Sequence, residues 1–116
     1  MQKKTIGNLG EKIIAGRLIE QGFQIVGRQI RTRYGEVDLV ATKPHKVLFV
    51  EVKTRTSRLF GCPEDAITPK KRVTMRKTAL SLVQRMNIKC DWELVVYAVE
   101  LNLVKKTATC SQYQLD

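Results

Sequence analysis

Residues 36–55 read EVDLVATKPHKVLFVEVKTR, and this stretch decides the fold. Two runs with strand character, residues 36–41 and 47–53, are joined by a short connection around Lys43-Pro44-His45-Lys46. Runs rich in β-branched residues on either side of a proline-containing turn are typical of paired strands. A link this short joins them antiparallel. We therefore predict a β-hairpin with its turn centred on Pro44 and His45.

The register of this hairpin decides which charged side chains meet. If the two lysines beside the turn pair with each other, Asp38 lies directly opposite Glu51, and Glu36 lies opposite Lys53. Directly opposed residues point to the same face, with Cβ atoms roughly 4.5–5.5 Å apart. A slip of one residue would move Glu51 to the other face. The preferred register therefore predicts a cluster of three acids and one lysine.

Two carboxylates at that separation repel each other, so the pair is favoured if a divalent cation lies between them. Mg²⁺ takes oxygen ligands and suits one or two carboxylates together with a phosphate. We expect Asp38, Glu51 and the main-chain carbonyl of Val52 to be the metal ligands. Lys53 is placed to orient a water molecule or to neutralise charge on a phosphate. The structural alternative is a surface ladder of ion pairs with a Glu36–Lys53 salt bridge.

The elements on either side complete an α/β pattern. Residues 7–21 have helical character, with Gly22 as a stop signal, and Glu11 falls on the same arc as the apolar residues Ile14, Ala15, Leu18 and Ile19. A short strand is expected at residues 23–26 and a polar, mobile loop at 54–67. Thr68-Pro69 predicts the start of a second helix that ends near Met86. A buried strand at residues 92–99 and an edge strand at 107–115 follow, which gives a mixed sheet.

The composition favours an acidic partner. The 116 residues hold 21 Lys and Arg against 11 Asp and Glu, a net charge of +10. Residues 1–90 carry 19 basic and 7 acidic side chains, so the positive charge is concentrated there. Such an excess of positive charge on a chain of single-domain length indicates a polyanionic partner, with nucleic acid as the first candidate. A merely soluble basic protein is the simpler alternative. We expect one domain over residues 1–116.

Other classes of protein are disfavoured. No apolar run approaches the roughly 20 residues that cross a bilayer, and the N-terminus is polar rather than signal-like. We expect a cytoplasmic protein that does not contact membranes. Three widely spaced cysteines (Cys62, Cys90 and Cys110) argue against a disulfide framework and a zinc ribbon. His45 lies in the predicted turn, so a metal here would need oxygen donors.

The ordered motifs resemble a known family. An acidic strand residue followed by Glu-x-Lys on the next strand is the signature of the PD-(D/E)xK, restriction-endonuclease-like superfamily, and the chain is most similar to its small bacterial YraN-like proteins, predicted endonucleases. The similarity covers residues 7 to about 99. The motifs that carry it are GxxGE at 7–11, GF at 22–23, RxxxGExDLV at 31–40, FVEVKTR at 49–55, FG at 60–61 and PKKR at 69–72.

The resemblance implies a mixed β-sheet flanked by helices in the order α-β-β-β-α-β(-β). It also implies that Asp38, Glu51 and Lys53 are catalytic and that Glu11 is the helix-borne acid of resolvase-like relatives. The chain departs from the pattern where Val37 replaces the superfamily's proline, and Gln29 stands where the family commonly has Asn. In addition, Asp91-Trp92-Glu93 replaces the usual Arg-Phe-Asp.

Basic residues near these motifs are candidate phosphate ligands. They precede the acidic strand, follow Lys53 or crowd the start of the second helix, and they are Arg31, Arg33, Arg55, Lys70, Lys71 and Arg72. Nothing in the sequence resembles a base-reading module, so contacts to phosphate and to shape are favoured.

The hypothesis is an endonuclease, dependent on Mg²⁺ or Mn²⁺, that hydrolyses DNA, with branched or structured DNA as the candidate substrate. The first alternative is a non-catalytic nucleic-acid-binding protein on the same fold. A third, an adaptor for an acidic protein, rests on charge alone. A homodimer is compatible with a nuclease because one site cuts one strand, but no residue indicates one.

Overall fold

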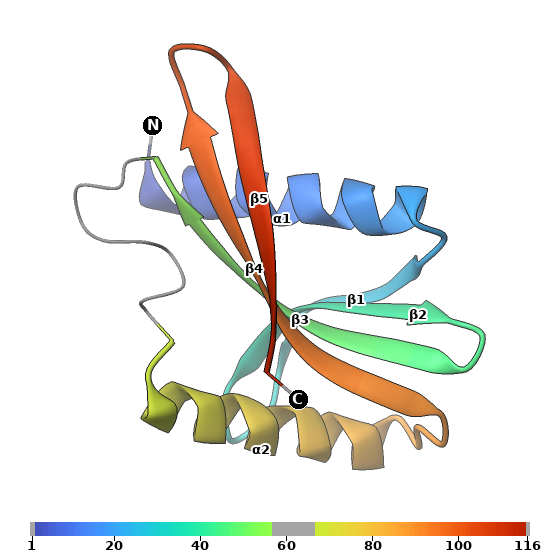
Figure 1. The fold of residues 1–116 in the computed structure, drawn as a ribbon. Helices are drawn as coiled ribbons and strands as arrows, with labels where there is room; N and C mark the ends of the chain where they lie inside the picture. Colours follow the sequence, from blue (N-terminus) through green and yellow to red (C-terminus); the bar gives the residue numbers. More distant parts are fainter. Residues whose placement is uncertain (1, 57–66, 116) are drawn as a thin grey trace.

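The computed structural model describes residues 2–56 and 67–115. Within these ranges, two helices and five strands follow one another (Figure 1): α1 (Lys3–Glu20), β1 (Gln24–Arg31), β2 (Glu36–Lys43), β3 (Lys46–Arg55), α2 (Pro69–Arg85), β4 (Asp91–Asn102) and β5 (Thr107–Gln114). The predicted order α-β-β-β-α-β-β is confirmed, including the last edge strand.

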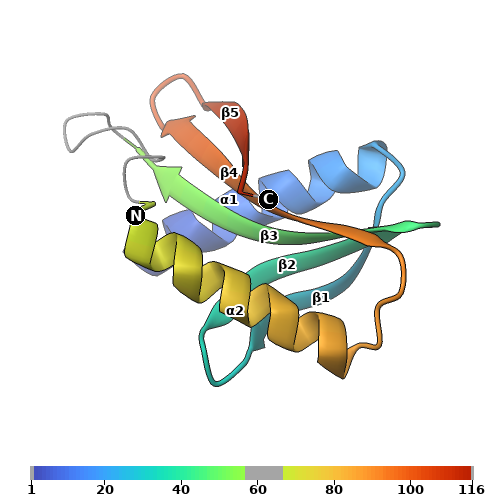
Figure 2. The ribbon, with the colours of Figure 1, turned by 60° about the horizontal axis from the view of Figure 1, so that its bottom comes forward.

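The five strands form one sheet in the spatial order β1-β2-β3-β4-β5. β3 and β4 are parallel and every other neighbouring pair is antiparallel, so the predicted mixed sheet is confirmed. A parallel pair needs a crossover, and α2 provides it. The two helices cover opposite faces of the sheet (Figure 1), and a view turned by 60° shows α2 crossing in front of the strands (Figure 2). The core therefore has two halves, one under each helix.

The hairpin of β2 and β3 has the predicted register. Lys43 pairs with Lys46, and the pairing continues without a shift to Leu39 and Val50. His45 has a φ of 73°, in the left-handed region that a tight turn requires. The turn therefore sets which residues face each other along both strands, as the sequence predicts.

Helix α1 begins earlier than predicted, at Lys3, and its expected arc holds except at one position. Ile14, Ala15 and Leu18 are buried against the sheet, whereas Ile19 is 55% exposed. Gly22, with a φ of 95°, follows the helix as the predicted stop signal. Helix α2 starts as predicted, because the side chain of Thr68 accepts a hydrogen bond from the main-chain N–H of Lys71 at 3.1 Å.

Several predicted strand boundaries differ from the observed ones. The strand expected at residues 23–26 extends to Arg31. The sequence did not reveal its full length, because β1 is an edge strand whose side chains are largely exposed and lack apolar alternation. The polar segment expected from residue 54 begins later, since Thr54 and Arg55 continue β3 in register with β4. Residues 57–66 of the expected loop, and with them the FG motif at 60–61, lie outside the described residues.

Gly10 allows α1 to approach β3 closely. The glycine is buried, and a Cβ atom at this position would overlap the hydroxyl of Thr54. Gly7, one turn earlier on the same helix, has open space around it. Because Glu11 follows Gly10 directly, this close contact also sets how near Glu11 comes to the sheet.

We expect the substitution Gly10→Ala to destabilise the protein and Gly7→Ala to stabilise it. Overlap with Thr54 should cost about 1–3 kcal/mol, whereas the alanine at position 7 should gain up to about 1 kcal/mol from helix propensity. Chemical denaturation of the two variants beside the parent chain measures both changes. Equal effects of the two substitutions would contradict the close packing at Gly10.

Candidate active site

Asp38 lies where the sheet is irregular on three neighbouring strands. The ladder between β2 and β3 ends at Leu39 and Val50, and beyond it the main-chain N–H of Val52 donates to the Asp38 carboxylate at 2.7 Å. On the other side, the register of β1 and β2 places Gln29 across from Asp38, and Gln29 has a φ of 50°. A side-chain oxygen therefore takes part in the hydrogen bonding between two strands.

The alternation of side chains along β2 is interrupted at the same point. Val37 and Val40 both pack into the half of the core under α2, while Leu39 packs under α1. Strict alternation would put Val37 and Leu39 on one face. The sequence-based expectation that Glu36 and Asp38 share a face assumed regular alternation, which does not hold across this position.

Glu51 and Lys53 lie on β3 beside Asp38. Phe49, two residues earlier, packs under α2, and alternation puts Glu51 and Lys53 on that face. The ammonium of Lys53 is 3.4 Å from the Glu51 carboxylate, and the side chains are 28% and 17% exposed. The Glu51 carboxyl is also within hydrogen-bonding reach of Asp38. The structure thus brings together the three residues of the predicted catalytic motif.

Burial and mutual repulsion set the charge of the two carboxyl groups. Burial raises the pKa of Asp38, and the hydrogen bond from the Val52 N–H opposes that rise. Burial and the nearby Asp38 carboxylate raise the pKa of Glu51 to about 7, although Lys53 acts in the opposite direction. A half-buried acid pair beside one lysine therefore favours either a shared proton or an added cation.

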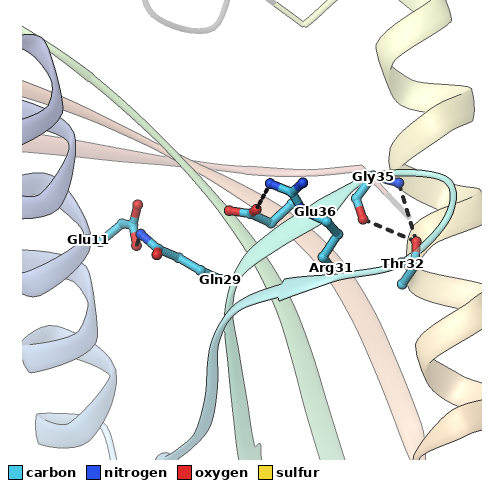
Figure 3. A network of polar contacts seen from close by, with 6 residues as sticks. All are labelled: Glu11, Gln29, Arg31, Thr32, Gly35 and Glu36. Carbon is cyan, nitrogen blue, oxygen red and sulfur yellow. Dashed lines mark hydrogen bonds and ion pairs between the residues drawn. The ribbon is translucent and has the colours of Figure 1, made fainter.

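Glu11 approaches Asp38 from α1. Its carboxylate accepts a hydrogen bond from the Gln29 side chain at 3.3 Å, and Figure 3 shows the two residues facing each other between α1 and β1. Burial and the charge of Asp38 raise the pKa of Glu11. Asp38 therefore interacts with acids on both sides of the sheet: Glu11 on the α1 side and Glu51 on the α2 side.

Gln29 is a site residue that the sequence analysis did not identify. It holds Glu11 by a hydrogen bond and occupies the left-handed backbone region that Asn enters more readily than most residues. The sequence did carry a signal, because the resembling family commonly has Asn at this position. The left-handed backbone of Gln29 explains that preference.

Glu36 does not pair with Lys53, so the salt bridge of the structural alternative, the surface ladder of ion pairs, is not formed. Glu36 binds Arg31 instead, at 3.3 Å across β1 and β2 (Figure 3). Arg31 and Glu36 are register partners on those strands, whereas the β2–β3 ladder ends before it reaches Glu36. Lys53 pairs with Glu51 instead, as expected if both residues belong to a catalytic site.

Of the predicted basic residues, Lys71 on α2 is the one that reaches the acid cluster. The adjacent Lys53, followed by partial burial, lowers the pKa of Lys71. Two ammonium groups therefore lie side by side next to Glu51. The other predicted phosphate ligands lie elsewhere: Arg31 in its ion pair, Arg33 at the β1–β2 turn, Arg55 at the end of β3, and Lys70 and Arg72 exposed on the first turn of α2.

The donor set fits a hard divalent cation. Among the described residues, no three Asp, Glu, His or Cys side chains converge as a complete metal-binding group. Asp38 and Glu51 nevertheless supply two adjacent carboxylates, which is the number that Mg²⁺ commonly takes from a protein while it keeps several waters. A cation would also relieve the repulsion that raises the pKa of Glu51.

Neither helix in the described ranges has the length and hydropathy needed to cross a bilayer.

A solved structure has the same fold. The crystal structure of a repair endonuclease from Pyrococcus abyssi superimposes with a TM-score of 0.51 at 18% sequence identity. The superposition covers 89% of this chain, which spans only 41% of the length of that endonuclease. Together with the element order, this likeness confirms the predicted class, a restriction-endonuclease-like mixed sheet flanked by helices.

Sequence relatives cover most of the chain. A UPF0102 protein of Alkaliphilus oremlandii is 36% identical over 104 residues, or 89% of each chain. A second, from Caldicellulosiruptor saccharolyticus, is 38% identical over 104 residues, which is 89% of this chain and 88% of the relative. The model of Uncharacterised protein family UPF0102 matches residues 10–104. The chain belongs to this family, the YraN-like family that its motifs resemble.

Proposed function

We propose that the protein is a metal-dependent endonuclease that hydrolyses phosphodiester bonds in DNA. The observation that carries the proposal is the acid pair of Asp38 and Glu51 with Lys53 bound to Glu51 at 3.4 Å. This pair lies where β2 and β3 part, so a main-chain N–H and three side chains converge on a small region. The fold shared with a repair endonuclease is consistent with this activity.

Asp38, Glu51 and the carbonyl of Val52 are the proposed ligands of Mg²⁺ or Mn²⁺. When bound, the cation supplies Lewis-acid polarisation of a phosphoryl oxygen and a water of lowered pKa. The N–H of Val52 holds the Asp38 carboxylate in place from within the sheet. Glu11, held by Gln29, adds a further acceptor from the α1 side.

Lys53 and Lys71 provide positive charge at the same place. Lys53 is anchored by Glu51 and is proposed to orient the attacking water or to stabilise the charge that develops on the phosphate. Lys71 lies next to it on the first turn of α2, where main-chain N–H groups also favour a phosphate. The repulsion between the two ammonium groups is relieved when an anion binds between them.

The other basic residues are proposed to bind the DNA backbone around this centre. Four of the seven acids in residues 1–90 (Glu11, Glu36, Asp38 and Glu51) lie in or beside the cluster, so the remaining surface of that segment is strongly basic. Such a distribution holds a cation at the centre and phosphates at the rim. Structured or branched DNA is the proposed substrate.

Cleavage assays test the function directly. Linear duplex, single-stranded, flap and four-way DNA are incubated with Mg²⁺, Mn²⁺ or a chelator, with the parent chain and with Lys53→Ala. We expect metal-dependent cleavage that falls about 10²- to 10³-fold in this variant. Lys46→Ala is the matched control, because Lys46 is on the same strand but pairs with Glu93 at 2.8 Å.

The outcomes separate the proposal from its alternatives. Cleavage that continues in the chelator, or that Lys53→Ala and Lys46→Ala reduce equally, would contradict the mechanism. DNA binding with no cleavage under any condition would favour the non-catalytic DNA-binding protein on the same fold.

A further inference from the structure

A hollow of ≈ 640 Å³ lies between the β1–β2 turn and α2, apart from the acid cluster. The turn contributes Arg33 and Tyr34, and α2 contributes the rest of the lining. The residues that matter to the argument are Arg33, Tyr34, Lys77, Leu80, Ser81 and Gln84. We call this hollow the turn pocket.

An aromatic ring and a guanidinium form the turn side of this pocket. The guanidinium carbon of Arg33 is 4.9 Å from the centre of the Tyr34 ring, and an Arg33 N–H donates to the Tyr34 hydroxyl at 2.6 Å. Tyr34 is nevertheless 38% exposed. Both groups are flat and can stack on a nucleobase, and neither one is buried in the core.

The turn that carries this pair is held in place before any ligand arrives. The Thr32 hydroxyl accepts from the N–H of Gly35 and donates to the Gly35 carbonyl (Figure 3). The same hydroxyl also accepts from the N–H of Tyr34. Arg85 on α2 donates to the carbonyl of Arg31 at 3.3 Å, which joins the helix to the end of β1.

Gly35 brings the turn close to α2. Its φ is 157°, and a Cβ atom at this position would be 3.1 Å from the Thr78 hydroxyl. The turn that carries Tyr34 therefore lies close to α2.

The wall formed by α2 offers complementary groups. Leu80 is 44% exposed and gives the lining an apolar surface, while Lys77 adds a positive charge to it. Ser81 and Gln84 add hydrogen-bonding groups. The turn pocket thus combines an apolar surface with hydrogen-bonding groups and two cations. This combination matches a nucleobase joined to phosphates better than it matches an apolar side chain.

We propose that the turn pocket binds one unstacked base of a DNA strand whose backbone enters the acid cluster. This inference rests on the proposed function and adds that the substrate has a single-stranded segment beside the scissile phosphate. Tyr34 and Asp38 are four residues apart, so the chain between them spans at most about 14 Å. The pocket therefore lies within a few nucleotides of the proposed metal ligands. Bases inside a duplex are stacked and cannot enter the turn pocket.

Binding measurements in a chelator test the pocket without cleavage. The probes are a fluorescein-labelled oligothymidylate and a duplex of the same length, each followed by anisotropy. We expect Tyr34→Ala to weaken binding of the single strand about 5- to 150-fold and to leave duplex binding unchanged. Tyr34→Phe keeps the ring and should bind like the parent chain. Val104→Ala is the control, because Val104 is 92% exposed at the β4–β5 turn.

A second probe locates the base. Oligothymidylates that each lack one base at a different position are compared on the parent chain and on Tyr34→Ala. Removal of the base at one position should weaken binding to the parent chain. The same removal should have no further effect on binding to Tyr34→Ala. Equal weakening of single-strand and duplex binding, or a loss in Tyr34→Phe as large as in Tyr34→Ala, would overturn the proposal. Because no cleavage is measured, these results are independent of whether the acid cluster is catalytic.

Discussion

Asp38→Asn should reduce metal-dependent cleavage by about 10³-fold or more, which corresponds to about 4 kcal/mol of transition-state stabilisation. The amide oxygen of Asn can still accept the hydrogen bond from the Val52 N–H, so the strands should keep their arrangement. What is lost is the negative charge that pairs with Glu51 to hold a divalent cation. The variant therefore separates the metal-binding role of Asp38 from its structural role.

Two measurements distinguish these roles. Calorimetric titration with Mn²⁺ should show binding to the parent chain and none to Asp38→Asn, while chemical denaturation in a chelator should show that the variant is at least as stable as the parent. Cleavage by Asp38→Asn at the parent rate would remove Asp38 from the mechanism. Loss of cleavage together with a large loss of stability would indicate that the carboxylate acts on the fold alone.

In a chelator, the free energy of unfolding should fall as the pH rises from about 4.5 to about 7. Glu51 has its ordinary pKa in the unfolded chain and a raised pKa in the folded one. Within this window the folded state therefore holds more protons, and each rise in pH favours the unfolded state. The free energy of unfolding should therefore be about 3 kcal/mol lower above this window than below it, for a pKa shift of this size. Asp38, whose pKa is also raised, adds to the loss.

Glu51→Gln provides the matched variant, because a neutral amide mimics the protonated acid. Above the window and without metal it should be more stable than the parent chain, and its stability should depend less on pH. Added Mg²⁺ should stabilise the parent chain and not this variant. Denaturant titrations on both sides of the window measure these differences. Stability that rises with pH across the window in the parent chain would contradict the raised pKa.

The hairpin and the meeting of Asp38 with Glu51 were predictable because they depend on local signals. Pro44 and His45 fix the turn, and the turn fixes the register over the next five pairs. The helix start at Thr68 was equally predictable, since the cap is formed within one turn. In each case the deciding interaction lies within a few residues along the chain.

The rest depends on contacts that no periodic pattern encodes. The partner of Glu36 differs from the one that regular pairing implies, because the ladder between β2 and β3 ends at Leu39. That break depends on the Asp38 side chain, which accepts a hydrogen bond from the main chain of β3. The left-handed backbone at Gln29 is unusual for its residue type, so propensity could not predict it. The meeting of Lys71 with Lys53 requires the docking of α2 on the sheet, which is set by the core as a whole.

The parallel pairing of β3 with β4 has a consequence for the order in which the chain assembles. The β2–β3 hairpin closes a very short loop, whereas Lys46 meets Asp91 only after the whole crossover through α2 has closed. Closing the longer loop costs more entropy, so non-local pairing of this kind slows folding. We therefore expect Asp38 and Glu51 to come together in a fast, local folding step and Lys71 to join them in a slower one. Repulsion between the two acids would then act before α2, which carries Lys71, has docked.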